Sequence, residues 1–164
     1  MKTTFELKQQ GMSLIEILVV IMLMSICSLW GLHGWQDYQQ ALRLEQNAQK
    51  LRIYLVGLQA QANAYNRSII LWAIGGSQGC VGYSVPPESC ASSAGLARFV
   101  VSDPHIELVD FTEKVMGFYG IRNGAQAGHI TLRNSAGGIR LVLSARGRIR
   151  LCSEGKRMSG LSLC

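Results

Sequence analysis

The sequence predicts an α+β protein in which a long N-terminal helix packs on an antiparallel β-sheet. Three observations indicate this fold. Residues 12–65 contain no strong helix breaker, and they pass from a continuous apolar run into an amphipathic pattern. From residue 67 onward, short apolar runs alternate with Gly, Ser, Asn and Pro, as in strands joined by turns. The length of 164 residues suits one domain and is too short for two with separate cores.

Residues 12–33 are predicted to form a membrane-spanning helix. The run Met12–Leu32 holds 21 residues and a single charge, at Glu16. As a helix it would be roughly 31 Å long, about the thickness of the hydrocarbon core of a bilayer. The preceding residues 1–11 are polar and carry two lysines, which favours the cytoplasmic side for them.

Residues 1–11 are predicted to be a leader that is removed by proteolysis. A secretory signal peptide would be cut after its apolar region at a small-x-small site, and the stretch Gly31-Leu32-His33-Gly34 fits such a site poorly. Gly11 instead lies before the apolar run, so cleavage after it would remove the leader and keep the helix. Cleavage there would also give Met12 a free amine, four residues from Glu16.

Glu16 has two interpretations. A charge at the centre of a membrane span costs up to about 2.5–3.5 kcal/mol on insertion scales, so ionisable groups inside a membrane usually have a partner. When helices of several copies pack side by side, the new amine of Met12 on one copy can pair with Glu16 on another. The alternative is a carboxylate near the lipid headgroups that is simply hydrated.

The residues Gly11-Met12-Ser13-Leu14-Ile15-Glu16, followed by an apolar run, resemble the prepilin signature of type IV pilins and type II secretion pseudopilins. The resemblance implies that prepilin peptidase cuts between Gly11 and Met12 and methylates Met12, and that Glu16 guides docking onto other pilins or pseudopilins. It also implies a single-pass protein of the bacterial inner membrane with a periplasmic head, which later enters a pilus or pseudopilus. Met12 stands where the family usually has Phe.

Residues 34–66 are predicted to continue the same helix, from about Met12 to about Tyr65, as an amphipathic segment. Apolar residues recur there at steps of four, three, four and three, which places them on one helical stripe. They are Leu51, Leu55, Leu58, Ala62 and Tyr65. Polar residues fill most of the other positions, so this stripe is expected to cover a face of the sheet.

Residues 67–164 are predicted to form the antiparallel β head. The candidate strands are Ile69–Ile74, Arg98–Val101, Ile106–Val109, Val115–Arg122, His129–Asn134, Gly138–Ser144 and Arg148–Cys152. Residues 134–138 and 144–147 have the composition of hairpin turns, so the last three strands are expected to form an antiparallel meander. Residues 77–95 are expected to be a loop-rich insert.

The last strands carry a second resemblance. The stretches are Gly128-His129-Ile130, Ile139-Arg140-Leu141-Val142-Leu143-Ser144 and Gly147-Arg148-Ile149-Arg150-Leu151-Cys152. They are similar to the GspH/FimT-like minor pilins, whose sheet ends in a Gly-Arg-x-Arg strand. The resemblance implies a minor pilin or pseudopilin that helps to prime filament assembly. In DNA-uptake members of that group, the Gly-Arg-x-Arg element is linked to DNA binding.

Four of the five cysteines lie beyond the apolar run and flank short loops, as in a disulfide-bearing domain of an oxidising compartment. Cys80, Cys90, Cys152 and Cys164 allow three pairings. We favour Cys80 with Cys90 and Cys152 with Cys164, because each pair closes a short loop that contains Gly, Ser or Pro. Cys27 is then left over.

The positive charge of the chain is local. The net charge is +6, and residues 122–157 hold eight basic residues against one acid, a charge of +7. On a strand, Arg148 and Arg150 would project from one face, roughly 6.6 Å apart, a spacing compatible with adjacent phosphates. Arg146, Arg148 and Arg150 are therefore candidate DNA contacts. The alternative is arginines that are solvated or paired with a neighbouring subunit, since no aromatic residues interleave with them.

No motif in the sequence predicts an enzyme, a cofactor or a metal site. His33, His105 and His129 are isolated and are expected to be structural or solvated. The acidic residues at 103–113 lack the Gly-centred alternation of a calcium loop. The glycine-rich residues 75–79 lack the lysine of a phosphate loop. The sequence therefore favours a structural subunit over an enzyme.

Overall fold

A computed structural model describes residues 13–90, 98–112, 115–120, 124–158 and 160–164, and all of their side chains except those of residues 29–33. The chain divides into two compact units, residues 1–36 and residues 37–164. One helix, α1 (Leu14–Ala64), contributes residues to both units.

The described part of the first unit is helical. The helix begins after Ser13, whose carbonyl oxygen accepts hydrogen bonds from the backbone amides of Glu16 (3.0 Å) and Ile17 (3.3 Å). The hydroxyls of Ser25 and Ser28 donate to the carbonyl oxygens four residues earlier, each at 2.7 Å. These two polar side chains are thus satisfied within the helix and need no water.

The second unit combines the rest of α1 with short strands. In its described residues the strands are β1 (Ser68–Ile74), β2 (Gly76–Ser77), β3 (Cys80–Tyr83), β4 (Arg98–Val100), β5 (Glu107–Phe111), β6 (Met116–Tyr119), β7 (Gly124–Gln126), β8 (Gly128–Asn134), β9 (Gly137–Leu143) and β10 (Ile149–Glu154). They form a sheet of order β4-β3-β1-β6-β7, here called sheet A, and a sheet of order β10-β9-β8-β5-β2, called sheet B. All strand pairs that the structure describes are antiparallel.

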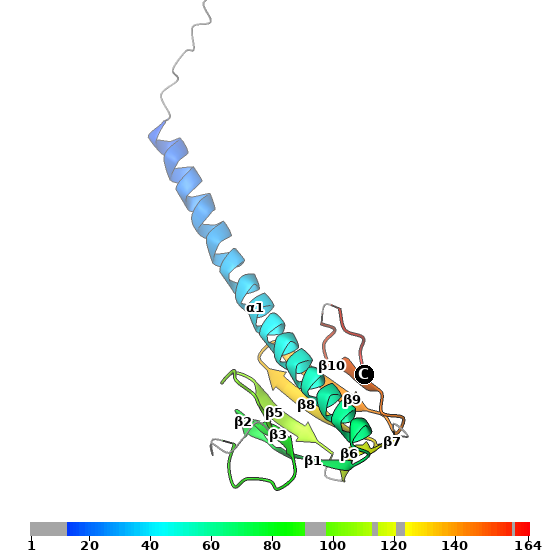
Figure 1. Ribbon diagram of the computed structural model, residues 1–164. Coiled ribbons are helices and arrows are strands. Elements are labelled where there is room, and N and C mark those ends of the chain that lie inside the picture. Colours follow the sequence, from blue (N-terminus) through cyan, green and yellow to red (C-terminus); the bar gives the residue numbers. More distant parts are fainter. Residues whose placement is uncertain (1–12, 91–97, 113–114, 121–123, 159) are drawn as a thin grey trace, which may run out of the picture. The chain divides into compact units, whose positions relative to one another are not determined.

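The helical part of the second unit packs on both sheets through one apolar stripe (Figure 1). Its buried residues recur at steps of four, three, four, three and four, the spacing of one face of a helix. They are Leu44, Ala48, Leu51, Leu55, Leu58 and Ala62. Strand residues from both sheets, such as Phe118 and Leu141, complete the core. Burying a leucine side chain contributes about 1.5–3 kcal/mol, so this stripe is a main source of stability.

The helix ends at Ala64 because Asn66 takes up a left-handed conformation, with φ at 48°. The amide of Arg67 then donates to the carbonyl oxygen of Ala62 at 3.0 Å, which satisfies one of the last helical carbonyls. Asn is one of the few residues other than Gly that adopts this conformation readily. Gly120 lies against the Asn66 side chain, where a Cβ atom would collide with the amide oxygen.

The α+β fold and the antiparallel meander β8-β9-β10 confirm the sequence predictions, but several details differ, and the short strands β2 and β7 were not predicted. The stripe predicted to include Tyr65 stops before it, since Tyr65 is 69 % exposed. The expected insert at 77–95 contains β3, which pairs with both β1 and β4. The predicted strand Val115–Arg122 is shorter, as β6 ends at Tyr119. The strands form two sheets in the described residues, where one was expected.

Two disulfides fasten segments of the second unit, and they are the pairs favoured from the sequence. Cys80 is bonded to Cys90, and Cys152 to Cys164. The second bond holds the last residues against β10, where the Ser153 amide donates to Ser162 O at 2.8 Å and the Cys164 amide donates to Ser153 O at 3.1 Å. The chain end therefore covers part of the edge of sheet B, which reduces the risk of unwanted strand pairing. Cys27 is free and exposed.

Candidate functional site

The predicted cleavage residues Gly11 and Met12 lie outside the described residues. Glu16, the predicted assembly residue, is exposed in the first turn of α1. Ser13 precedes the helix and Glu16 is its third residue, the spacing of a Ser-x-x-Glu capping box. A carboxylate at this position also interacts favourably with the positive end of the helix dipole. The position of Glu16 is therefore also one that favours the start of a helix.

The N-terminal part of α1 exposes mostly large apolar side chains, with Glu16 as the one charged residue in its described side chains from residue 14 to residue 28. Its large hydrophobic residues range in exposure from 42 % for Val20 to 77 % for Leu14. They are Leu14, Ile15, Ile17, Leu18, Val19, Val20, Ile21, Met22, Leu23, Met24 and Ile26. A helix surface that is mostly apolar is stable only when an apolar environment covers it. Among the described residues, no helix meets the length and apolarity needed to cross a membrane.

The three candidate DNA contacts lie together at the turn between β9 and β10, Arg146 and Arg148 within the turn and Arg150 at the start of β10. Arg146, Arg148 and Arg150, with Ser144 and Ala145, line a hollow of about 380 Å³ that we call the arginine hollow. All three side chains are exposed. In the part of the chain that the structure describes, none of the three forms an ion pair. One correction applies to the sequence prediction: β10 begins at Ile149, so Arg148 lies just before the strand.

The turn that carries these arginines is fixed at several points. Within it, the Ser144 amide donates to Arg148 O at 3.0 Å, and Gly147 takes a φ of 73°, which a residue with a Cβ rarely adopts. Gln59 Nε2 on α1 donates to Gly147 O at 3.0 Å. The Ala125 amide of β7 donates to Ala145 O at 3.1 Å. The helix and sheet A therefore hold the arginine hollow in place.

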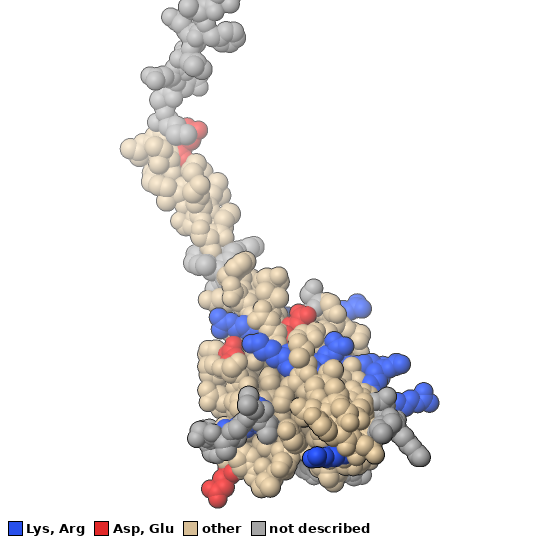
Figure 2. All heavy atoms as spheres, viewed as in Figure 1, with Lys and Arg blue, Asp and Glu red and all other residues tan. Residues whose placement is uncertain are grey.

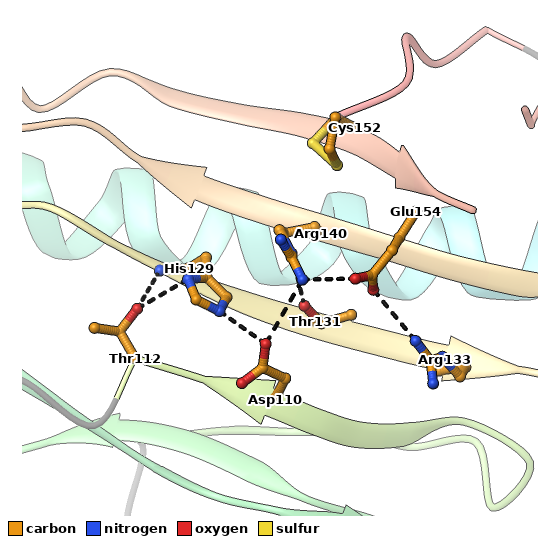
Figure 3. A network of polar contacts seen from close by, with 9 residues as sticks. Asp110, Thr112, His129, Thr131, Arg133, Arg140, Cys152 and Glu154 are labelled. Atoms are coloured by element: carbon orange, nitrogen blue, oxygen red, sulfur yellow. Dashed lines mark hydrogen bonds and ion pairs between the residues drawn. A yellow bond between two sulfur atoms is a disulfide. The ribbon is translucent and has the colours of Figure 1, made fainter. Parts of the chain in front are cut away.

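Other arginines of the basic stretch are neutralised by acids. Arg140 Nη2 lies 2.6 Å from Glu154 Oε1 and 3.7 Å from Asp110 Oδ2, and Arg133 lies 3.4 Å from Glu154 Oε2 (Figure 3). In Figure 2, Lys and Arg side chains gather on the side of the head where Figure 1 places β10. The pairing in Figure 3 means that only some of this charge is available to a ligand.

His129 belongs to a polar network that the sequence analysis missed (Figure 3). Its Nε2 lies 2.8 Å from Asp110 Oδ2, and its Nδ1 lies 3.0 Å from the Thr112 hydroxyl, which also accepts the His129 amide at 2.8 Å. The order hydroxyl, imidazole, carboxylate is that of a hydrolase triad. The hollows that we describe, among the described residues, are lined by residues other than Thr112. The contacts join β8 to β5, so the network fits a structural clamp.

Metal binding has no candidate among the described residues, where no group of three or more His, Cys, Asp or Glu side chains is suitably placed. Asp103, from the acidic stretch, pairs with Arg43 at 3.8 Å. The four cysteines of the head are engaged in disulfides.

Comparison with known proteins gives a match near the amino terminus. Residues 7–32 match the family model of the prokaryotic N-terminal methylation motif. The matched range contains Gly11, Met12 and Glu16, so the chain carries a type IV pilin-like N-terminal signal. No match was found among curated proteins or among solved structures.

Proposed function

We propose that this protein is a minor pilin or pseudopilin, a structural subunit rather than an enzyme. It is made as an inner-membrane precursor, is cut by prepilin peptidase between Gly11 and Met12, and is methylated on Met12. It then joins other minor and major pilins or pseudopilins through Met12–Leu32, and it helps to prime assembly of a type IV pilus or a type II secretion pseudopilus.

The single observation that carries this proposal is the helix surface from Leu14 to Ile26, which exposes large apolar side chains and only one charge, Glu16, within the range that matches the methylation motif. Water is a poor solvent for such a surface, and lipid before assembly or neighbouring helices after assembly would cover it. The internal hydrogen bonds of Ser25 and Ser28 support this proposal, because unsatisfied hydroxyls are costly in an apolar environment. The membrane proposal itself rests on the sequence run Met12–Leu32.

Glu16 is proposed to dock the subunit. Cleavage after Gly11 leaves the amine of Met12 near the start of α1, and a neighbouring copy or related subunit can pair its own amine with Glu16. In an apolar surrounding such a pair is stronger than in water, whereas an unpaired carboxylate is costly. The capping position of Glu16 is compatible with this role, since a carboxylate in the first turn stays close to the amino terminus.

Features of the head support the finer assignment. Disulfides persist in oxidising compartments, so the bonds Cys80–Cys90 and Cys152–Cys164 favour a periplasmic head. The meander β8-β9-β10 coincides with the stretches that resemble GspH/FimT-like minor pilins. Within that group, the layout and the cysteine pairs most resemble prepilin peptidase-dependent protein A of enteric bacteria.

The proposal is tested by mass spectrometry of the amino terminus. The full chain is expressed in cells with and without prepilin peptidase, and the expected product with the enzyme begins at Met12 and carries one methyl group. Gly11→Val, which adds a branched side chain at the cut, is expected to keep the leader, and Gly34→Ala is a control outside the site. An intact leader on the unaltered chain in cells containing the enzyme would contradict the proposal.

DNA binding is a second candidate function, favoured by the arginines of the arginine hollow, which form no ion pair with any residue that the structure describes. Arg150 also lines an adjoining hollow of about 300 Å³ together with Arg140 and the last residues of the chain. Arg150 thus lines both the arginine hollow and this second hollow. Together they could hold a nucleic-acid backbone whose phosphates follow β10, the edge strand of sheet B. Each phosphate contact would contribute about 0.9 to the slope of log affinity against log salt.

The DNA candidate is tested by salt titration of duplex binding to the full chain in detergent. Replacement of Arg146, Arg148 and Arg150 by Ala is expected to reduce the salt slope by up to about 2.7, from three lost phosphate contacts. A matched control is Arg133→Ala, which removes an arginine that is already paired with Glu154. An unchanged slope in the triple variant would eliminate this function for the turn.

A further inference from the structure

A second hollow, unrelated to the basic turn, lies where α1 ends. It has a volume of about 610 Å³, and we call it the tyrosine hollow. Its lining comes from three segments: Gln61 and Tyr65 from the end of α1, Arg67, Ser68 and Ile69 from the start of β1, and Tyr83 and Ser84 from the end of β3. The volume falls within the range of small-molecule sites.

Two of the residues that line the tyrosine hollow, Tyr65 and Tyr83, are aromatic. Tyr65 is 69 % exposed, and the Arg67 guanidinium lies over its ring, 5.6 Å from the ring centroid. Tyr83 is half-buried beside Tyr54, whose ring centroid is 6.2 Å from that of Phe99. Burial and then the neighbouring Tyr83 raise the pKa of Tyr54 to about 12. Tyr83 therefore lies next to the aromatic pair Tyr54 and Phe99, and Tyr65 is held by its contact with Arg67.

The backbone around the hollow is held in uncommon conformations. Asn66 and Ser84 have φ values of 48° and 74°, and they are two of the three non-glycine residues with positive φ among the described residues. Asn66 takes this conformation where α1 ends, and Ser84, a residue that adopts it rarely, takes it directly after β3. Asn66 directly precedes the lining residues Arg67, Ser68 and Ile69, and Ser84 is itself a lining residue. The backbone at these two positions therefore determines where the lining side chains lie.

The chemistry of the lining selects one class of ligand. Of the lining side chains only Ile69 lacks a hydrogen-bonding group, and the others offer hydroxyls, an amide and a guanidinium. The rings of Tyr65 and Tyr83 can pack on the apolar C–H faces of a sugar, and the hydrogen-bonding groups can bind its hydroxyls. Arg67 is the one charged lining residue, and a guanidinium binds carboxylates with paired hydrogen bonds.

We infer that the tyrosine hollow binds a saccharide that carries a carboxylate. In this complex Tyr65 and Tyr83 pack against the sugar ring, and the Arg67 guanidinium pairs with the carboxylate. A nucleic acid fits less well, because its successive phosphates require several cations and the other basic residues of the head concentrate in residues 122–157. This site is independent of the proposed filament function.

The test is saturation-transfer NMR on the full chain, in a detergent without a sugar headgroup. The probes are the trisaccharide of galacturonic acid, the neutral trisaccharide cellotriose and a short thymidine oligonucleotide. The acidic trisaccharide is expected to bind, and to bind more tightly than cellotriose. Arg67→Gln is expected to weaken the acidic probe by about tenfold or more, the usual worth of a charged hydrogen bond, and to leave cellotriose unchanged.

Three further variants separate the loss of ring contact from the loss of folding. Tyr65→Ala is expected to weaken both saccharides, and Tyr65→Phe, which keeps the ring, is expected to restore most of the binding. Tyr119→Ala removes an exposed tyrosine outside the hollow and should change nothing. Circular dichroism checks that each variant is folded. The inference is overturned by absence of saccharide signals, by equal loss in Tyr119→Ala, by equal binding of cellotriose, or by tighter binding of the oligonucleotide at these residues.

Discussion

Replacing Leu51 by Ala is expected to lower the free energy of unfolding of the head by about 2–5 kcal/mol, the usual cost of truncating a buried leucine. Leu51 has 0 % exposure and lies in the middle of the buried stripe of α1. Ala48 and Leu55, one turn away on either side, are also buried. The space left by the missing atoms is therefore enclosed by packed neighbours, which keeps the cost within this range.

Ile53→Ala is the matched control, because Ile53 is two residues further along the same helix and is 70 % exposed. Its expected effect is within about 0.5 kcal/mol. Urea unfolding of the full chain in detergent, followed by near-ultraviolet circular dichroism, measures both variants. With a slope of about 2 kcal/mol per molar urea, the Leu51→Ala midpoint falls by about 1–2.5 M. Equal midpoints for the two variants would refute the assignment of this helix face to the core.

Three other predictions concern the head. Replacing Cys152 and Cys164 by Ser removes a bond with a sequence separation of 12 and is expected to cost about 3 kcal/mol, measured as a lower urea midpoint without reducing agent; an unchanged midpoint would contradict a stabilising role for this bond. Because the pKa of Tyr54 rises from 10.0 to about 12 on folding, the stability that depends on its neutral phenol is complete below pH 10 and is lost as the pH rises to 12. Tyr54→Phe should flatten that part of the pH–stability curve, and an unchanged curve would contradict the assignment. Gly120→Ala, whose Cβ would collide with the Asn66 side chain, should lower the melting temperature, and an unchanged value would show that the turn adjusts freely.

The elements found from the sequence are those with a local signal. The stripe Leu51, Leu55, Leu58 and Ala62 repeats at helical spacing, and all four residues are buried. The meander β8-β9-β10 was recognisable from alternating residues with glycine at the turns. The two arginines on either side of Ile149 were placed on one face by the same alternation, and both line the arginine hollow.

The features that were missed depend on residues far apart in the chain. β3 has four residues with a glycine among them, and Gly82 is needed because the Trp72 ring of β1 lies where its Cβ would be. The clamp at His129 joins Asp110 of β5, 19 positions away, and Thr112, which directly follows β5 and is 17 positions away. The tyrosine hollow likewise requires α1 to end beside β3. The periodicity of residues within one segment does not predict which distant segments will come into contact.

The measurement that tests the central claim most directly is the fraction of mature protein found in sheared filaments when Glu16 is replaced by Gln. Glu45→Gln, a similar change in the helical part of the head, serves as the control. If Glu16 docks the subunit by pairing with an amine of its neighbour, processing at Gly11 continues, and the Glu16→Gln protein stays in the inner membrane and is lost from filaments. Undiminished incorporation of that variant would contradict the account.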